Sequence, residues 1–169
     1  MQDERNWCDV KLIVFSDSHR ELGPMRDVIE REKPDYVFHL GDHDADAEAI
    51  SREFQALPVA TVRGNCDRWS ATPETLTPTL GGLRFYLCHG HTLGVKSGYL
   101  RAVYAAREQN ADVLLFGHTH ETYRECMELD GHKRLFVLNP GSCGYGYRPT
   151  YGFFLIENQS ILDWGVSDC

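Results

Sequence analysis

The chain has 169 residues, of which 42% are hydrophobic and 25% are charged, and its formal net charge at pH 7 is −8. This composition is typical of one globular domain that buries a core without cross-links. The acidic balance argues against sequence-independent binding to a nucleic-acid backbone, which requires a basic excess to replace counterions. We expect residues 1–9 to form a polar leader and residues 10–169 a single domain.

Membrane and disulfide-dependent classes are also disfavoured by the sequence. No apolar run approaches the length that spans a bilayer, and the first six residues are too polar for a signal peptide. A cytoplasmic location is therefore expected. The six cysteines include no CxxC pair, which argues against a zinc cluster built on thiolates, and disulfides are not expected in a reducing compartment.

Short apolar runs alternate with amphipathic segments in the first part of the chain. This alternation is typical of strands and helices that wind around a parallel sheet. The expected strands are 11–15, 35–40 and 59–62, and the expected helices are 24–33 and 45–55. The first of these helices begins with a proline and places Met25, Val28 and Ile29 on one face.

The second part of the chain contains hairpin signals. Strands 75–80 and 83–88 flank Gly81-Gly82, a two-residue turn. A helix at 99–109, with Leu100, Val103 and Tyr104 at helical spacing, precedes a strand at 112–116. Two further pairs of strands are expected at 121–129 with 133–138 and at 151–156 with 160–164. The elements together predict an α/β fold, a four-layer αββα sandwich of two mixed sheets flanked by helices.

Five of the expected strands end in clusters of polar side chains. Ligands of open α/β sheets gather outside the carboxyl ends of strands, so these clusters should meet. The clusters are Asp17-Ser18-His19, Gly41-Asp42, Gly64-Asn65, His89-Gly90-His91 and Gly117-His118-Thr119-His120. Carboxylates, an amide oxygen and imidazoles suit two borderline divalent ions such as manganese, iron, zinc or nickel, and do not suit calcium. Two such ions would also reduce the net charge of the chain from −8 to −4 and would place positive charge where a phosphate ester binds.

The pair His118 and His120 is ambiguous by itself. In an extended chain, side chains at positions i and i+2 point to the same side, roughly 6–7 Å apart. Two imidazoles held in this way can bind one ion, bind one each of two neighbouring ions, or lie as unrelated surface histidines. Partners from the other four clusters decide between these interpretations.

The ordered set of motifs resembles the calcineurin-like metallophosphoesterase superfamily, over about residues 11–156. Gly64-Asn65-Cys66-Asp67, Pro73-Glu74 and Asn139-Pro140-Gly141-Ser142 resemble its small single-domain phosphodiesterase branch. The resemblance implies two divalent ions, with Mn²⁺ expected and Ni²⁺, Fe²⁺ or Zn²⁺ as alternatives. It implies hydrolysis of small phosphodiesters or phosphomonoesters by a hydroxide that bridges the two ions. One ion would be held by Asp17, His19, Asp42 and His120, and the other by Asp42, Asn65, His89 and His118.

The resemblance leaves the general acid open. Cys66 stands where many members have a histidine that protonates the leaving oxygen, and a thiol beside two cations should lose its proton and serve poorly as an acid. His91 is the other candidate, either as a proton donor or phosphate contact or as a residue that orients a metal ligand. His39 is expected in the core, His43 is a weak pocket candidate, and His132 is expected to be solvated in a turn.

Two alternatives to this enzyme class remain. The fold also resembles the small subunit of the retromer coat, a non-catalytic binding scaffold with substituted metal motifs, whereas all seven candidate ligands are present here. A metallo-β-lactamase-type hydrolase requires HxHxDH, but His120 is followed by Glu121-Thr122. Small family members are often dimers or tetramers, so a homo-oligomer is expected by analogy.

Overall fold

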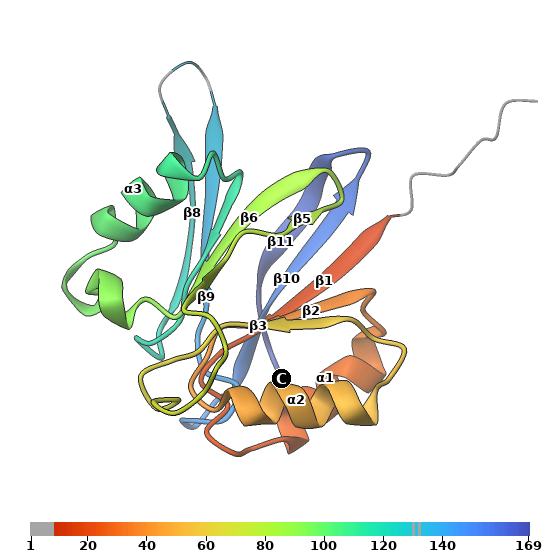
Figure 1. Ribbon diagram of the computed structural model, residues 1–169. Coiled ribbons are helices and arrows are strands. Elements are labelled where there is room, and N and C mark those ends of the chain that lie inside the picture. The colour runs from red at the N-terminus through yellow and green to blue at the C-terminus, as the bar shows by residue number, and fades with distance from the viewer. Residues whose placement is uncertain (1–8, 130, 132) are drawn as a thin grey trace, which may run out of the picture.

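The computed structural model describes residues 9–129, 131 and 133–169. The polar leader, apart from its last residue, and His132 therefore lie outside the described residues. Two sheets face each other, α1 and α2 cover the outer face of one sheet, and α3 covers the outer face of the other (Figure 1). This arrangement is the predicted four-layer αββα sandwich.

The first sheet has the strand order β11-β10-β1-β2-β3. Strands β1, β2 and β3 are parallel, whereas β10 runs antiparallel to both β1 and β11. The strands are β1 (Val10–Phe15), β2 (Tyr36–His39), β3 (Val59–Thr61), β10 (Thr150–Glu157) and β11 (Ser160–Asp168). The parallel pairs are joined by α1 (Gly23–Glu32) and α2 (Asp44–Glu53), which is the predicted alternation of strand and helix.

The second sheet has the strand order β4-β6-β7-β9-β8, and β5 pairs with β6. Its strands are β4 (Thr75–Leu76), β5 (Thr79–Leu80), β6 (Leu83–Cys88), β7 (Val113–Leu115), β8 (Thr122–Glu128) and β9 (Arg134–Pro140). The expected continuous strand 75–80 is wrong: it is divided into β4 and β5 around Pro78, which has no N–H for the ladder. The turn at Gly81-Gly82 is confirmed, with positive φ at both glycines.

The core lies between the sheets and under the helices, and the strands distribute their side chains by simple alternation. Leu12 and Val14 of β1 join the cluster between the two sheets, whereas Ile13 and Phe15 join the cluster under α1 and α2. Each of these four side chains is fully buried. A strand buried on both faces therefore reads as a continuous apolar run, as the sequence indicated.

The orientation of α3 (Leu100–Glu108) differs from the expected one. Its buried residues are Ala102, Val103 and Ala106, while Leu100 and Tyr104 are mostly exposed. The buried face of α3 thus consists mainly of small side chains, which pack in one cluster with Leu114 of β7 and Leu135 of β9. Two short 3-10 helices, His91–Leu93 and Val95–Ser97, lead from β6 into α3.

The topology brings the five polar clusters together. Strands β1, β2 and β3 are mutually parallel, and β6, β7 and β9 are parallel in the other sheet, so within each sheet their carboxyl ends lie at one edge. Asp17 and Asp42 follow strands of the first sheet and lie close to His89, His118 and His120 of the second, so the two edges adjoin. Backbone hydrogen bonds join the loops within each sheet, from Asp17 N–H to the Gly41 carbonyl (3.0 Å) and from Gly117 N–H to the His89 carbonyl (3.0 Å). Within the described ranges no helix is long and apolar enough to cross a membrane.

Candidate metal centre

Two groups of ligand atoms adjoin at this edge. Within each group the donor atoms all lie within 4.8 Å of one another. The first group is formed by Asp17, His19, Asp42 and His120, and the second by Asp42, His89 and His118. Asn65 joins the second group, because its Oδ1 lies 3.2 Å from His89 Nε2. The structure thus brings all seven predicted ligands together, and the two groups share Asp42.

The loops that carry these ligands have unusual backbone conformations. The left-handed region (φ between 46° and 69°) is occupied by Asp17, His19, Asp42, His118 and His120. Such conformations cost energy for non-glycine residues and concentrate at functional sites. The extended geometry expected for His118 and His120 is therefore wrong, because β7 ends at Leu115 and the chain turns sharply. The two imidazoles nevertheless reach different groups.

Asp17 is the anchor of the first group. Its Oδ2 accepts hydrogen bonds from Ser16 Oγ and from the His118 N–H (3.1 Å). Its buried Oδ1 has no hydrogen-bond partner among the described residues, although it lies 3.1 Å from His120 Nε2. Burial raises the pKa of Asp17, but the surrounding histidines outweigh burial, so its pKa lies below the usual value. A buried, ionised oxygen that accepts no hydrogen bond and faces imidazoles fits a metal ligand.

Asp42 and His89 form the centre of the second group. His89 donates from Nδ1 to the Leu40 carbonyl (2.8 Å), which leaves Nε2 facing Asp42 Oδ1 at 3.5 Å. Burial lowers the pKa of His89 and raises that of Asp42, but their mutual attraction dominates: the pKa of His89 is raised and that of Asp42 is lowered. A cation can take the place of the His89 proton, because metal binding requires the neutral imidazole.

Two other histidines of the centre, His118 and His19, have pKa values below the ordinary value. Burial, together with His89, lowers the pKa of His118 to about 4. Burial likewise lowers the pKa of His19, although Asp17 and Asp42 act in the opposite direction. These imidazoles therefore present free lone pairs to an incoming cation.

The two candidates for the general acid lie next to different ligand residues, His91 beside His89 and Cys66 beside Asp42. His91 has a buried Nδ1 without a hydrogen-bond partner among the described residues, and its ring centroid is 5.4 Å from that of His89. Cys66 is exposed, and burial of the thiol together with the Asp42 carboxylate raises its pKa to about 11. The expected loss of the Cys66 proton thus requires the cations. A pocket of about 320 Å³ adjoins these groups and is lined by Arg63, Gly64, Asn65, Asp67, Arg68, Glu74 and His91.

The residues that hold the loops together lie outside the predicted set of metal ligands. Asp67 accepts hydrogen bonds from the N–H groups of His43 (2.9 Å), Asp44 (3.1 Å) and Gly64 (2.7 Å), so it ties the loop after β2 to the loop after β3. A glycine and an aspartate three residues apart, at 64 and 67, are the only sequence signal for this turn.

A second set of positioning contacts is centred on Ser18. Its hydroxyl donates to Asp46 Oδ2 (2.6 Å) and lies 3.0 Å from Nε2 of His39. His39 is buried, as expected, and accepts the Gly41 N–H at Nδ1 (3.3 Å). Burial lowers the pKa of His39 to about 4, so it stays neutral and supports the loops that carry Asp17 and Asp42.

Residues 10–159 match the sequence profile of the Calcineurin-like phosphoesterase superfamily domain. The chain belongs to this superfamily. It is 30% identical over 135 residues to probable metallophosphoesterase YsnB of Bacillus subtilis, covering 79% of this chain and 75% of that protein. It is 28% identical over 181 residues to phosphodiesterase MJ0936 of Methanocaldococcus jannaschii, covering 91% and 98% of the two chains. Like these relatives, the protein is a metal-dependent phosphoesterase.

Solved structures share the fold. A conserved protein of Streptococcus pneumoniae TIGR4, described as a predicted phosphoesterase, superposes with a TM-score of 0.72 at 25% identity, covering 96% of this chain and 99% of that chain. Vacuolar Protein Sorting 29 of Cryptosporidium parvum superposes with a TM-score of 0.70 at 18% identity, covering 95% and 98%. The second likeness concerns the fold alone.

Proposed function

We propose that the protein is a dinuclear phosphodiesterase, in which residues 10–169 act as one domain and the two ligand groups each hold a divalent cation. The observation that carries this proposal is the sharing of buried Asp42 by both groups. The donor set of carboxylates, one amide and imidazoles favours Mn²⁺, with Ni²⁺, Fe²⁺ or Zn²⁺ as alternatives. Such a pair of ions supplies Lewis acidity toward the phosphate and lowers the pKa of water.

The residues around the centre have distinct tasks in this proposal. Asp17 and Asp42 provide fixed negative charge, and the Leu40 carbonyl holds His89 in one tautomer and orientation. The pocket beside Asn65 and His91 accommodates one substituent of the phosphate. Its Arg68 contributes positive charge, whereas its Arg63 is paired with Glu74 at 2.8 Å. Beside the first ligand group, the exposed Tyr145 lies with its ring centroid 5.1 Å from that of His120 and offers an aromatic face to a second substituent.

Hydrolysis of an aryl phosphodiester with added Mn²⁺ tests this proposal, with the corresponding aryl phosphomonoester as the comparison. We expect turnover of the diester, because the site is open on two sides of the centre and can accept both substituents. Absence of hydrolysis with any of manganese, nickel, iron and zinc would contradict the enzyme interpretation.

A non-catalytic binding scaffold is the alternative that the fold likeness to Vacuolar Protein Sorting 29 supports. The catalytic proposal is preferred because all seven ligand residues are present and lie together in the two groups. The proposed substrates are small phosphoesters in the cytoplasm, and a homo-oligomer is proposed by analogy with small family members. The acidic net charge of −8 argues against a nucleic-acid partner.

Cys66 is expected to limit the range of leaving groups. A thiol with a pKa near 11, or a thiolate once cations are bound, is poorly matched to proton donation at pH 7. Cys66→His should therefore raise kcat on diesters with alkyl leaving groups by about 100-fold, and should barely change it on nitrophenyl diesters. Steady-state kinetics on both substrate types checks this. Cys126→His changes an exposed cysteine of β8 in the same way and is the matched control; unchanged alkyl-diester rates in Cys66→His would sink the idea.

A further inference from the structure

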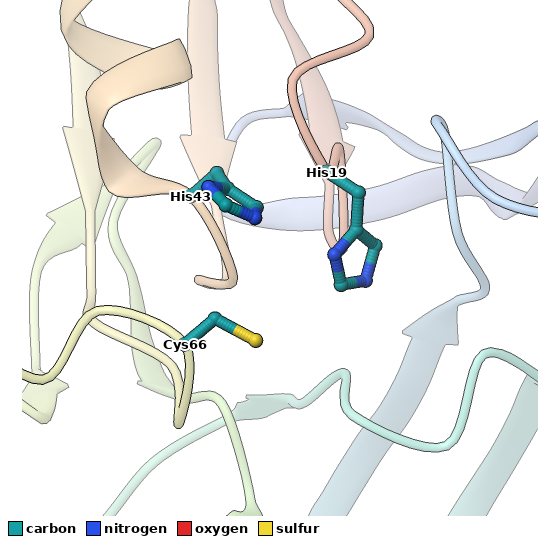
Figure 2. Close-up of side chains that lie close together, drawn as sticks. All are labelled: His19, His43 and Cys66. Carbon is teal, nitrogen blue, oxygen red and sulfur yellow. The ribbon is translucent and has the colours of Figure 1, made fainter.

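A third set of donor atoms lies beside the two ligand groups. The side chains of His19, His43 and Cys66 each offer one donor atom, and these atoms lie within 4.8 Å of one another. The residues come from the three loops that follow β1, β2 and β3, and Figure 2 shows the three side chains converging on a common space. Two of them, His43 and Cys66, belong to neither of the groups that share Asp42.

The backbone fixes His43 and Cys66 as neighbours. Asp67, itself 8% exposed, binds the N–H of His43 with one oxygen and the N–H of Gly64 with the other, and the Cys66 N–H is bound by Asp42 Oδ1 at 2.9 Å. His43 has a left-handed backbone (φ 74°), and its side chain makes no capping hydrogen bond to α2. Its imidazole has no hydrogen bond to any residue that the structure describes. Backbone hydrogen bonds thus hold the site in place. The Cys66 sulfur accepts a long hydrogen bond from Asn65 Nδ2 (3.5 Å), which a cation would displace.

His19 connects this set to the first ligand group. Its Nε2 lies 3.3 Å from Nε2 of His120, inside the first group. Figure 2 shows the other ring nitrogen on the side that faces His43 and Cys66, and the rings of His19 and His43 meet edge to face with centroids 5.4 Å apart. A neutral imidazole offers one lone pair at a time, so His19 can serve one of the two sites but not both.

The chemistry of this set differs from that of the dinuclear centre. It contains a thiol and two imidazoles and no carboxylate, and soft sulfur ligands favour zinc or copper over manganese. Tetrahedral zinc would place sulfur and nitrogen ligands about 3.6 Å apart. Because the donor atoms lie within 4.8 Å of one another, a movement of at most about 1 Å brings them to this separation, and the exposed Cys66 can supply it.

We propose that His19, His43 and Cys66 form an additional site for one thiophilic cation, best fitted by Zn²⁺, and that its occupation withdraws His19 from the dinuclear centre. Three protein ligands leave the fourth tetrahedral position open to solvent or to a phosphate oxygen. The Cys66 proton passes to solvent when the cation binds. Zinc then inhibits the manganese-loaded enzyme through this site.

Cobalt titration tests the site independently of catalysis, because a thiolate bound to Co²⁺ gives a charge-transfer absorption band in the near ultraviolet. The parent should show this band, and Cys66→Ser should lose it. In His43→Asn, asparagine tolerates the left-handed backbone. The cobalt dissociation constant measured from this band should rise by about tenfold or more. Cys126→Ser, a change at another exposed cysteine, is the matched control and should retain the band.

Two further outcomes separate this site from the dinuclear centre. His89→Ala removes a member of the second group only. The variant should therefore keep the Co²⁺–thiolate absorption band although its turnover is lost. In the manganese-loaded enzyme, His43→Asn should keep basal activity and require about tenfold more Zn²⁺ for half-inhibition. Three results would overturn the proposal. They are absence of the band from the parent, an unchanged cobalt affinity at this band in His43→Asn, and loss of the band in His89→Ala.

Discussion

Asp42→Asn should lower kcat/KM for phosphodiester hydrolysis by about a thousandfold, which corresponds to roughly 4 kcal/mol of transition-state stabilisation. Asp42 is the one residue that both ligand groups share, and its low pKa keeps it ionised at neutral pH. Asparagine preserves the shape of the side chain and the oxygen that accepts the Cys66 N–H. The variant should therefore fold and lose the charge that holds two cations at a short separation.

Asp44→Asn is the matched control for this prediction. Asp44 is buried like Asp42, lies two residues away at the start of α2 and accepts a hydrogen bond from Ser70. It belongs to neither ligand group, so its replacement should change kcat/KM by less than about threefold and lower stability slightly through loss of a helix N-terminal charge. Steady-state kinetics and urea unfolding of both variants make the comparison. Comparable activity in Asp42→Asn and Asp44→Asn would refute the shared role of Asp42.

Gly64→Ala should disrupt the centre through sterics alone. A Cβ at this position would lie 2.1 Å from Asp42 Oδ1 and 2.4 Å from the backbone nitrogen of Asp42. The loop after β2 and the loop after β3 would have to separate, since a backbone atom cannot move aside as a flexible side chain does. We expect the free energy of unfolding to fall by about 3 kcal/mol, and manganese binding by the folded protein to be lost.

Gly23→Ala provides the control, because a Cβ at that position meets no atom within 4 Å. It lies at the first residue of α1 and should be neutral or stabilising by up to about 1 kcal/mol. Urea unfolding monitored by circular dichroism, followed by manganese binding, distinguishes the two variants. Parent-like stability and metal affinity in Gly64→Ala would show that the two loops do not need this close approach.

The sequence predicted the position of the centre because the signal was distributed along the chain. Five strands are each followed by polar residues, and parallel strands with helical crossovers bring such ends to one edge of a sheet. The convergence of Asp17 and Asp42 in sequence-distant loops follows from topology alone. Buried strands such as β1 were recognisable because continuous apolar runs of this length have few other structural interpretations.

Conformations and contacts that depend on neighbouring loops were not predictable in the same way. The left-handed backbone at His118 and His120 has no local signature, because neither residue is a glycine or an asparagine. The role of Asp67 depends on three N–H groups supplied partly by another loop. The proximity of His43 and Cys66 arises from those same hydrogen bonds, so each residue gave only a weak signal by itself.

The number of Mn²⁺ ions bound per chain, measured together with turnover in the parent, His118→Ala and His120→Ala, tests the dinuclear centre most directly. His120 belongs to the first ligand group and His118 to the second. The account predicts two ions in the parent, one tightly bound ion in each variant, and loss of turnover in both variants. Two tightly bound ions in either variant, or equal activity in all three proteins, would contradict it.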